Sequence, residues 1–180
     1  MRMILVVCNG NMHRSVIAEE CIKNALNKNG LTEEYFVLSR GLQGTGGTKP
    51  PKYPNLRNYP LEWSLTEPIL DELDITIPTD KVSTPIDEKI VTESSLIIAM
   101  ENGVLFTKEN SLVRQFPKMR FKMKLFTELE DKADDIVDLY SQKDPAIVRR
   151  EVMRIDSIVK THLRQLLAWA DSLTPPEENK

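Results

Sequence analysis

Cys8 and Arg14 are the residues whose types and spacing suggest chemistry, and they lie in the segment VVCNGNMHRSV, residues 6–16. Gly10 permits a close backbone approach, so the residues between them can curl with their N–H groups pointing inward. A helix that begins beside Ser15 adds the positive potential of its N-terminus. Arg14 can hold two oxygens of a tetrahedral anion through paired hydrogen bonds. The segment predicts a phosphate-binding loop made of Asn9, Gly10, Asn11, Met12, His13, Arg14 and Ser15.

Cys8 lies at the base of this loop and has the surroundings of a nucleophile. Inward N–H groups, the helix end and the guanidinium of Arg14 all favour the thiolate form. A thiolate beneath a bound phosphate is placed for in-line attack. Cys21 instead falls on the apolar stripe of the following helix, so we expect it in the core. Two cysteines and two histidines form no zinc-type spacing, so we expect neither a metal nor a cofactor.

Alternating strands and helices must position these residues. Residues 3–7 form a short apolar run typical of a strand covered on both faces, and residues 15–30 show one apolar stripe at helical spacing. Residues 35–39 suggest a second strand, parallel to the first through the helical crossover. Residues 40–64 are rich in Gly, Pro, Asn and Thr, which predicts a long surface loop.

The second half of the chain continues this alternation. A short helix is expected over 66–73 with Pro68 in its first turn, and another after Thr84 as N-cap, with Pro85 at its first position and Asp87 in a capping box. Further expected elements are a buried strand over 95–100, a helix through Val104, Leu105 and Leu112 that Pro117 ends, an edge strand over 121–128, and a long amphipathic helix over 147–167. This order predicts a single doubly wound α/β domain, with a four-stranded parallel sheet, helices on both faces, and a ligand crevice at the carboxyl ends of the strands.

Composition excludes several classes of partner. The formal net charge is -3 without a basic run, so the chain lacks the electrostatic signature of a nucleic-acid-binding protein. No apolar run approaches the roughly 18 residues that a membrane span needs. We expect a cytoplasmic protein that binds neither nucleic acid nor membrane.

The segment ILVVCNGNMHRSVIAEE resembles the N-terminal signature of the low-molecular-weight protein tyrosine phosphatases and their arsenate reductase relatives. The positions that match are Cys8, Gly10, Asn11, Arg14, Ser15, Ala18 and Glu19. LSRG, residues 38–41, resembles the sequence that follows the second strand in this family. The resemblance implies a phosphatase-like domain over 1–173 with a loop insertion at 48–64. The sequence TPPEENK predicts a disordered tail over 174–180.

The same resemblance implies a general acid in an Asp-Pro pair before the last helix. Asp144 and Pro145 fit this pattern, and their distance from the end of that helix is close to the family's. Asp138 is the alternative, because DIVDLY resembles the family's acid motif with Leu139 in place of Pro. Helix spacing favours Asp144 over Asp138, and either residue would protonate a phenolate leaving group.

The chain also departs from the family pattern. His13 replaces the second cysteine of the signature, and we interpret it as a polar loop residue. The histidine that stabilises Asn11 in some members has no counterpart near residues 78–82. Met12 stands where the tyrosine phosphatases of this family resemble one another in a large aliphatic residue and phosphoarginine phosphatases carry Thr, so the resemblance favours phosphotyrosine as the substrate. An aromatic wall for that substrate is expected from among Tyr53, Tyr59, Trp63 and Tyr140.

Three hypotheses follow. The first is a metal-independent phosphomonoesterase for phosphotyrosine proteins or small aryl phosphates, which uses Cys8, Arg14 and Asp144 and forms a thiophosphate intermediate. The second is a glutathione-coupled arsenate reductase, since Cys21 is a poor partner for a thiol relay. The third is a module that binds phosphate or a phosphopeptide without turnover, which applies if neither aspartate reaches the loop.

Overall fold

The fold is built on one parallel sheet. The computed structural model describes residues 1–172, and its strands are β1 (Arg2–Cys8), β2 (Tyr35–Gly41), β3 (Leu96–Ala99) and β4 (Met123–Leu125). They lie in the order β2-β1-β3-β4, and every neighbouring pair is parallel. All four predicted strands are present, although β4 covers only part of the expected range 121–128.

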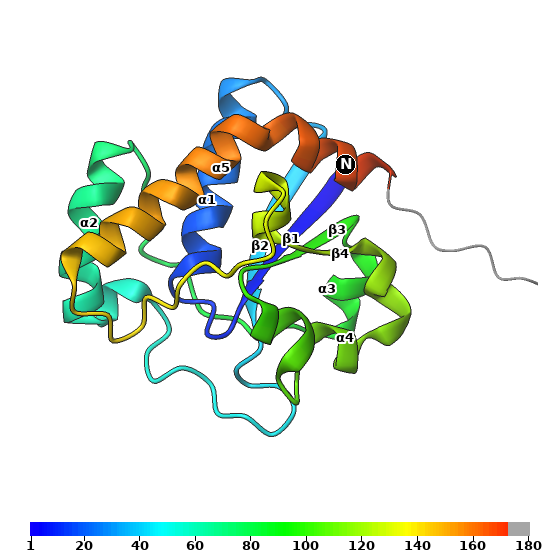
Figure 1. Cartoon of the computed structure of the whole chain (residues 1–180), viewed down its shortest axis with the longest axis horizontal. Coiled ribbons are helices and arrows are strands. Elements are labelled where there is room, and N and C mark those ends of the chain that lie inside the picture. Colours follow the sequence, from blue (N-terminus) through cyan, green and yellow to red (C-terminus); the bar gives the residue numbers. More distant parts are fainter. Residues whose placement is uncertain (173–180) are drawn as a thin grey trace, which may run out of the picture.

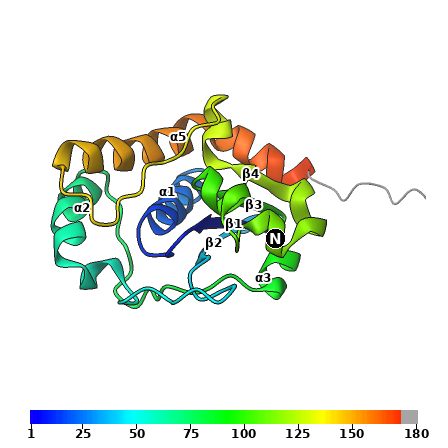
Figure 2. The same ribbon diagram turned by 60° about the horizontal axis from the view of Figure 1, so that its bottom comes forward.

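Helices cover both faces of the sheet (Figures 1 and 2). The helices α1 (Arg14–Lys28), α2 (Pro60–Glu72) and α5 (Pro145–Ser172) pack on one side, and α3 (Glu88–Glu93) and α4 (Leu112–Gln115) on the other. The predicted α/β fold with a four-stranded parallel sheet and helices on both faces is therefore confirmed. Shorter helical turns occupy Leu56–Asn58, Gly103–Thr107, Pro117–Lys122 and Phe126–Glu130.

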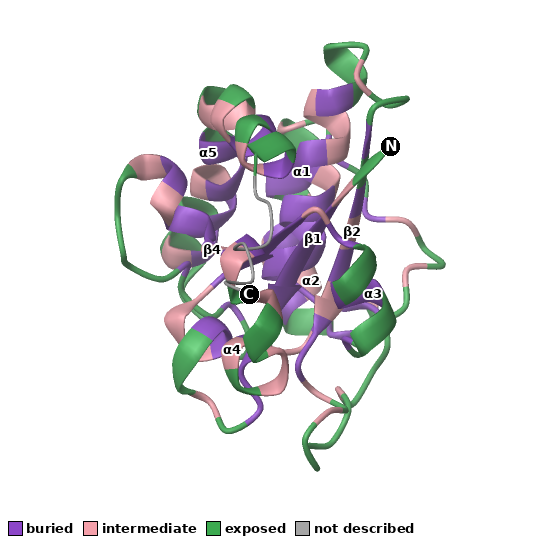
Figure 3. Cartoon of the chain, turned by 90° about the vertical axis from the view of Figure 1, so that its right-hand side faces the viewer, coloured by how far each residue is buried: buried purple, intermediate pink, exposed green. Residues whose placement is uncertain are grey.

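The central strand explains the continuous apolar run at the start of the chain. Ile4 and Val6 join the core beneath α1 and α5, whereas Leu5 and Val7 join the core beneath α3 and α4. All four side chains are fully buried, and Figure 3 shows the sheet buried between its helical layers. A strand covered on both faces has no polar face, which is why its sequence does not alternate.

The strand order also fixes where a ligand can bind. The chain runs from β1 to its neighbour β2 on one side, and β3 then pairs with β1 on the other side. Such a reversal opens a crevice at the carboxyl ends of the central strands. Residues 9–13, which connect β1 to α1, lie at this crevice.

The prediction for the helix near Pro68 was wrong at its start. Helix α2 begins at Pro60, within the stretch expected to be loop, and Pro68 lies inside the helix rather than in its first turn. Tertiary packing explains the difference, because Ile69 and Leu70 are buried in the core that α2 shares with α5.

The helix predicted after Thr84 also begins later. Asp87 is the N-cap of α3, and its side chain accepts a hydrogen bond of 2.8 Å from the Ile90 N–H. Thr84 cannot cap this helix, because residues 84–86 extend the sheet. The N–H of Gly41 donates to the Thr84 carbonyl (3.0 Å), and the N–H of Ile86 donates to the Gly41 carbonyl (2.9 Å).

The helix expected through Val104 and Leu112 is instead two short elements, Gly103–Thr107 and α4.

Other expectations concern membranes, metals and the C-terminal tail. Within residues 1–172, no helix has the length and apolarity to cross a bilayer, and no cluster of three or more metal-ligating side chains occurs. The expected tail over 174–180 lies outside the described residues.

Candidate active site

The phosphate-binding loop wraps around the sulfur of Cys8. The Asn11 N–H donates to Cys8 Sγ at 3.2 Å, and Ser15 Oγ lies 3.0 Å from the same sulfur. Cys8 ends β1 and Ser15 lies in the first turn of α1, so strand and helix hold the two partners rigidly. Hydrogen bonds to a sulfur favour its anionic form.

Asn11 gives the loop its shape. Its backbone is left-handed, with φ of 51°, which is uncommon for a residue other than glycine. Its side-chain amide donates to Ser39 Oγ (2.7 Å) and Ser15 Oγ (3.2 Å), and its Oδ1 accepts from the Thr84 N–H (2.9 Å). Three segments of the chain therefore hold Asn11 in this conformation.

Gly41 allows β2 to end against the loop. A Cβ atom at this position would lie 2.9 Å from the Asn11 nitrogen and 3.0 Å from the Asn9 carbonyl oxygen. Both are backbone atoms, so any larger residue would displace the loop. The glycine of LSRG is thus required by the close approach of the two chain segments.

Arg14 is almost fully buried and is oriented by two acceptors. Its Nη1 donates to Glu101 Oε2 and to the Ile136 carbonyl, each at 2.8 Å, and its Nη2 lies 3.4 Å from Asp138 Oδ1. Burial alone would lower the pKa of Arg14, but the neighbouring Cys8, Asp138 and Glu101 raise it. The guanidinium therefore stays charged beside the sulfur of Cys8.

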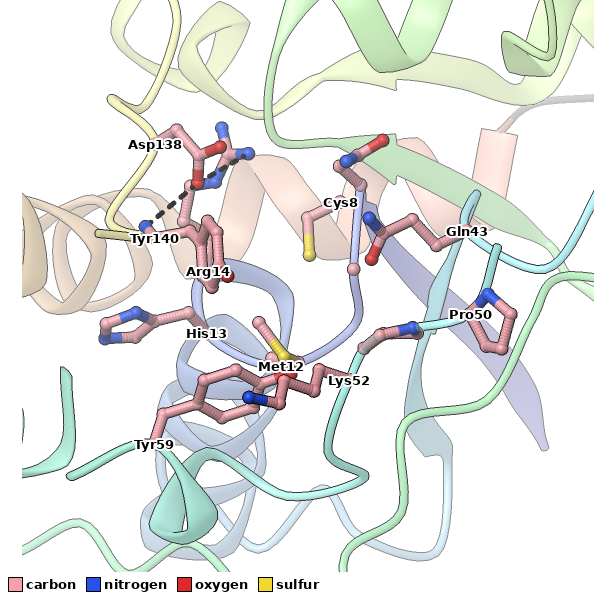
Figure 4. A pocket seen from close by; sticks show the side chains of 13 residues that line it. Cys8, Met12, His13, Arg14, Gln43, Pro50, Lys52, Tyr59, Asp138 and Tyr140 are labelled. Carbon is pink, nitrogen blue, oxygen red and sulfur yellow. Dashed lines mark hydrogen bonds and ion pairs between the residues drawn. The ribbon is translucent and has the colours of Figure 1, made fainter. Parts of the chain in front are cut away.

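These groups line one cavity at the carboxyl end of β1 (Figure 4). Its base is formed by Cys8 and the loop, and Asp138 and Tyr140 lie on one side. The rest of the lining comes from the segment that the sequence marked as an insertion, with Pro50, Pro51, Lys52 and Tyr59, and from Gln43.

The two candidate acids have different surroundings. Asp138 lines the cavity, and its Oδ1 accepts a hydrogen bond of 3.2 Å from the Tyr140 N–H. Asp144 is not among the lining residues. Its Oδ1 accepts from the Ala146 N–H at 2.9 Å, the bond of a residue that caps the start of α5. The structure thus brings Asp138, and not Asp144, together with Cys8 and Arg14.

Two of the four candidate aromatic residues contribute to the cavity wall. Tyr59 and Tyr140 line it, and their rings meet edge to face with centroids 6.0 Å apart. Tyr53 packs edge-on against the far side of Tyr59 at 5.1 Å. Trp63 does not line the cavity, and the guanidinium of Arg57 lies over its ring.

His13 is not a simple polar loop residue. It is buried, and its Nε2 forms a hydrogen bond of 2.8 Å with Thr66 Oγ1 on α2. Burial, together with the nearby charge of Arg14, lowers the pKa of His13 to about 3. The neutral imidazole therefore fastens the loop to α2.

This burial predicts a pH-dependent stability. The unfolded chain binds a proton at His13 below pH 6.5, whereas the folded protein does so only near pH 3, so stability falls as the pH decreases through this window. Between pH 7 and pH 5, the free energy of unfolding of the wild type should fall about 2 kcal/mol more than that of His13→Gln, which keeps a partner for Thr66. Urea unfolding at both pH values measures this difference. Equal falls in the two proteins would show that His13 is not buried in the neutral form.

Several residues of the site carried no recognised signal in the sequence. Glu101 follows the carboxyl end of β3, so the rule that ligands bind at strand ends would have marked it. Ser39 lies in the LSRG segment, but its contact with Asn11 joins residues 28 positions apart. Ser83 donates to the Gly10 carbonyl at 2.6 Å, although the sequence around it predicted only the start of a helix at Thr84.

A family model described as low molecular weight phosphotyrosine protein phosphatase matches residues 3–173. No curated protein matches the sequence.

Solved structures share the fold at low identity. A mutant of YwlE from Bacillus subtilis is 22% identical with a TM-score of 0.72, over 93% of this chain and 99% of that one. A low molecular weight protein tyrosine phosphatase from T. tengcongensis is 21% identical with a TM-score of 0.72, over 92% and 99%. A protein tyrosine phosphatase from Entamoeba histolytica is 19% identical with a TM-score of 0.69, over 93% and 98%.

Proposed function

Because the chain belongs to the low molecular weight phosphotyrosine protein phosphatase family, we propose that it hydrolyses phosphotyrosine, or a similar aryl phosphate, with Cys8 as the nucleophile. The observation that carries this proposal is the cavity itself. A sulfur that accepts hydrogen bonds, a buried guanidinium and a carboxylate face one space, and two tyrosine rings flank it.

The proposed reaction has two steps. In the first, the Cys8 thiolate attacks phosphorus, the bond from phosphorus to the phenolic oxygen breaks, and an aspartic acid gives its proton to that oxygen. In the second, water attacks the phosphocysteine, the same aspartate accepts the water's proton, and inorganic phosphate leaves as the thiolate is restored. Arg14 and the loop N–H groups bind the phosphoryl oxygens in both steps.

We propose Asp138 as the acid in place of Asp144. The proposal is supported by the shared cavity of Asp138 and Cys8 and by the 3.4 Å between Asp138 and Arg14. The Asp-Pro pair at 144–145 has a different, structural role, because Asp144 caps α5. A capping carboxylate is already engaged with the backbone and contributes to helix stability rather than to proton transfer.

The side chains that line the cavity suit the aromatic ring of an aryl phosphate better than the cationic group of a phosphorylated guanidine. Tyr59 and Tyr140 offer apolar ring surfaces, and Met12 adds a thioether at the base. A planar phenyl ring gains from edge and face contacts with such residues. Lys52 also lines the cavity, and its ammonium would repel the cationic group of a phosphoarginine.

The test compares matched substrates. Peptides of one sequence carrying phosphotyrosine, phosphoarginine or phosphoserine are assayed for phosphate release in EDTA. We expect the phosphotyrosine peptide to be hydrolysed with a kcat/KM at least about 10²-fold above the others. A preference for phosphoarginine would contradict the proposed substrate. Arsenate-dependent oxidation of glutathione without ester hydrolysis would indicate a reductase, and phosphate binding without turnover would indicate a binding module.

A further inference from the structure

A buried carboxylate lies behind the phosphate-binding loop, outside the proposed mechanism. Glu19 on α1 is 1% exposed. Its Oε1 accepts from Lys23 Nζ at 2.6 Å, and its Oε2 accepts from Ser39 Oγ at 2.5 Å and also from Lys81 Nζ. Burying an ionised carboxylate costs free energy unless it is paired and hydrogen-bonded. The hydrogen bonds from Lys23, Ser39 and Lys81 therefore keep Glu19 ionised in the interior.

A chain of hydrogen bonds connects Glu19 to Cys8. An ionised carboxylate only accepts, so the Ser39 hydroxyl must donate to it. The Asn11 amide then donates to Ser39 Oγ (2.7 Å) and to Ser15 Oγ (3.2 Å). With its oxygen accepting from Asn11, Ser15 has its own hydrogen free for the sulfur of Cys8, 3.0 Å away. The ionised Glu19 thereby fixes the Ser39 hydroxyl as a donor, while the Asn11 amide, whose Oδ1 accepts from the Thr84 N–H, donates to both serines.

Lys81 also fastens a second support of the loop. It lies within residues 78–82, the segment in which the sequence offers no histidine to support Asn11. Two residues beyond Lys81, Ser83 donates to the Gly10 carbonyl (2.6 Å), and the next N–H, that of Thr84, donates to Asn11 Oδ1 (2.9 Å). The ion pair between Lys81 and Glu19 is what joins this segment to α1.

We propose that Lys81 is a positioning residue for the phosphate-binding loop: its ion pair with Glu19 holds residues 78–84 against α1, so that Asn11 and Ser15 keep their orientation toward Cys8. This inference rests on the proposed role of Cys8 as nucleophile. Lys81 touches neither the sulfur nor the cavity and acts through its neighbours.

The electrostatics of Glu19 support this role. Burial alone would raise the pKa of Glu19, but hydrogen bonds from Lys23, Lys81 and Ser39 hold it below its usual value. Glu20, on the same helix, is the other acid in the cluster. The ionisable groups that line the cavity with Cys8 are His13, Arg14, Lys52, Tyr59, Asp138 and Tyr140, and the variants below leave all of them unchanged.

Lys23 provides a matched control, because it binds the other oxygen of Glu19 from within α1 and supports no loop. The first readout is kcat for p-nitrophenyl phosphate. The second is the pH dependence of alkylation by iodoacetamide, with peptide mass mapping to show that the alkylated residue is Cys8. For Lys81→Met we expect kcat to fall about tenfold and the midpoint of alkylation to rise by about one pH unit, since a less stabilised thiolate forms at higher pH. Lys81→Arg should restore both to within about threefold of the wild type, and Lys23→Met should change neither by more than about twofold.

Equal alkylation profiles in Lys81→Met and the wild type would overturn the proposal. Should Lys81→Met fail to fold in a thermal melt, Lys81→Gln, which keeps a donor without the charge, gives the same comparison. Alkylation needs no turnover, so the two proposals fail separately. A wild type that alkylates at Cys8 but hydrolyses no aryl phosphate would refute the function, whereas an active wild type with unshifted variants would refute the role of Lys81.

Discussion

Replacing Cys8 by serine should lower kcat for p-nitrophenyl phosphate by at least about 10⁴-fold while phosphate binding is retained. A serine hydroxyl is not ionised near neutral pH, so the variant lacks the nucleophile, but Arg14 and the loop N–H groups still surround the anion. Steady-state hydrolysis and calorimetric titration with inorganic phosphate measure the two properties. Activity of Cys8→Ser within tenfold of the wild type would exclude Cys8 as the nucleophile.

Cys21 provides the control for this substitution. It is buried in the core shared by α1 and α5, and this burial, reinforced by Asp156, raises the pKa of its thiol. A thiol that stays protonated is a poor nucleophile. Cys21→Ala should therefore keep kcat within about twofold and lose about 1 kcal/mol of stability through the small cavity left behind.

Replacing Asp138 by asparagine should produce a loss that depends on the leaving group. Phenolate, with a conjugate acid of pKa about 10, needs a proton as it departs, whereas nitrophenolate is far less basic. We expect the single-turnover rate constant to fall about 10²- to 10³-fold for phenyl phosphate and phosphotyrosine. The same rate constant should fall much less for p-nitrophenyl phosphate. The slope of rate against leaving-group basicity, across a series of substituted phenyl phosphates, is the measurement.

Asp144 is the matched control for Asp138, because it lies in the same connection before α5. Asp144→Asn keeps a side chain that can cap the helix, so kcat should stay within about twofold for every leaving group. Asp144→Ala should instead lower the free energy of unfolding by about 1 kcal/mol. A steep dependence on leaving group in Asp144→Asn, with none in Asp138→Asn, would restore the assignment that helix spacing favours.

Features encoded within a few consecutive residues were the ones that the sequence predicted well. The run that became β1 is apolar because both faces of this strand are covered, and the loop after it is compact enough for its parts to be recognised from spacing alone. The predicted boundaries of helices were wrong where contacts with residues distant in the sequence determine the local structure. Residues 84–86 pair with Gly41 instead of starting a helix, and α2 extends back to Pro60 as it packs against α5.

The choice between the two aspartates depended on similar long-range contacts. The N–H of Ile136 donates to the Met100 carbonyl at 3.1 Å, and Arg14 binds the carbonyl of Ile136, which draws the following residues over the cavity. Farther along, the N–H of Ser141 donates to Glu62 of α2 at 3.0 Å. These contacts determine which carboxylate faces Cys8, and none of them is visible in the spacing of residues along the chain.

The edge-to-face contact between Tyr59 and Tyr140 has a consequence for how this enzyme could acquire new substrates. Tyr59 belongs to the cavity wall, and Tyr140 lies two residues after the proposed acid. Because the two rings are in contact, a substitution that displaces one would alter the packing of the other. A single substitution at Tyr59 would then change both the wall that contacts the phosphoester and the packing of Tyr140 beside the proposed acid, and selection would act on the two properties as one trait.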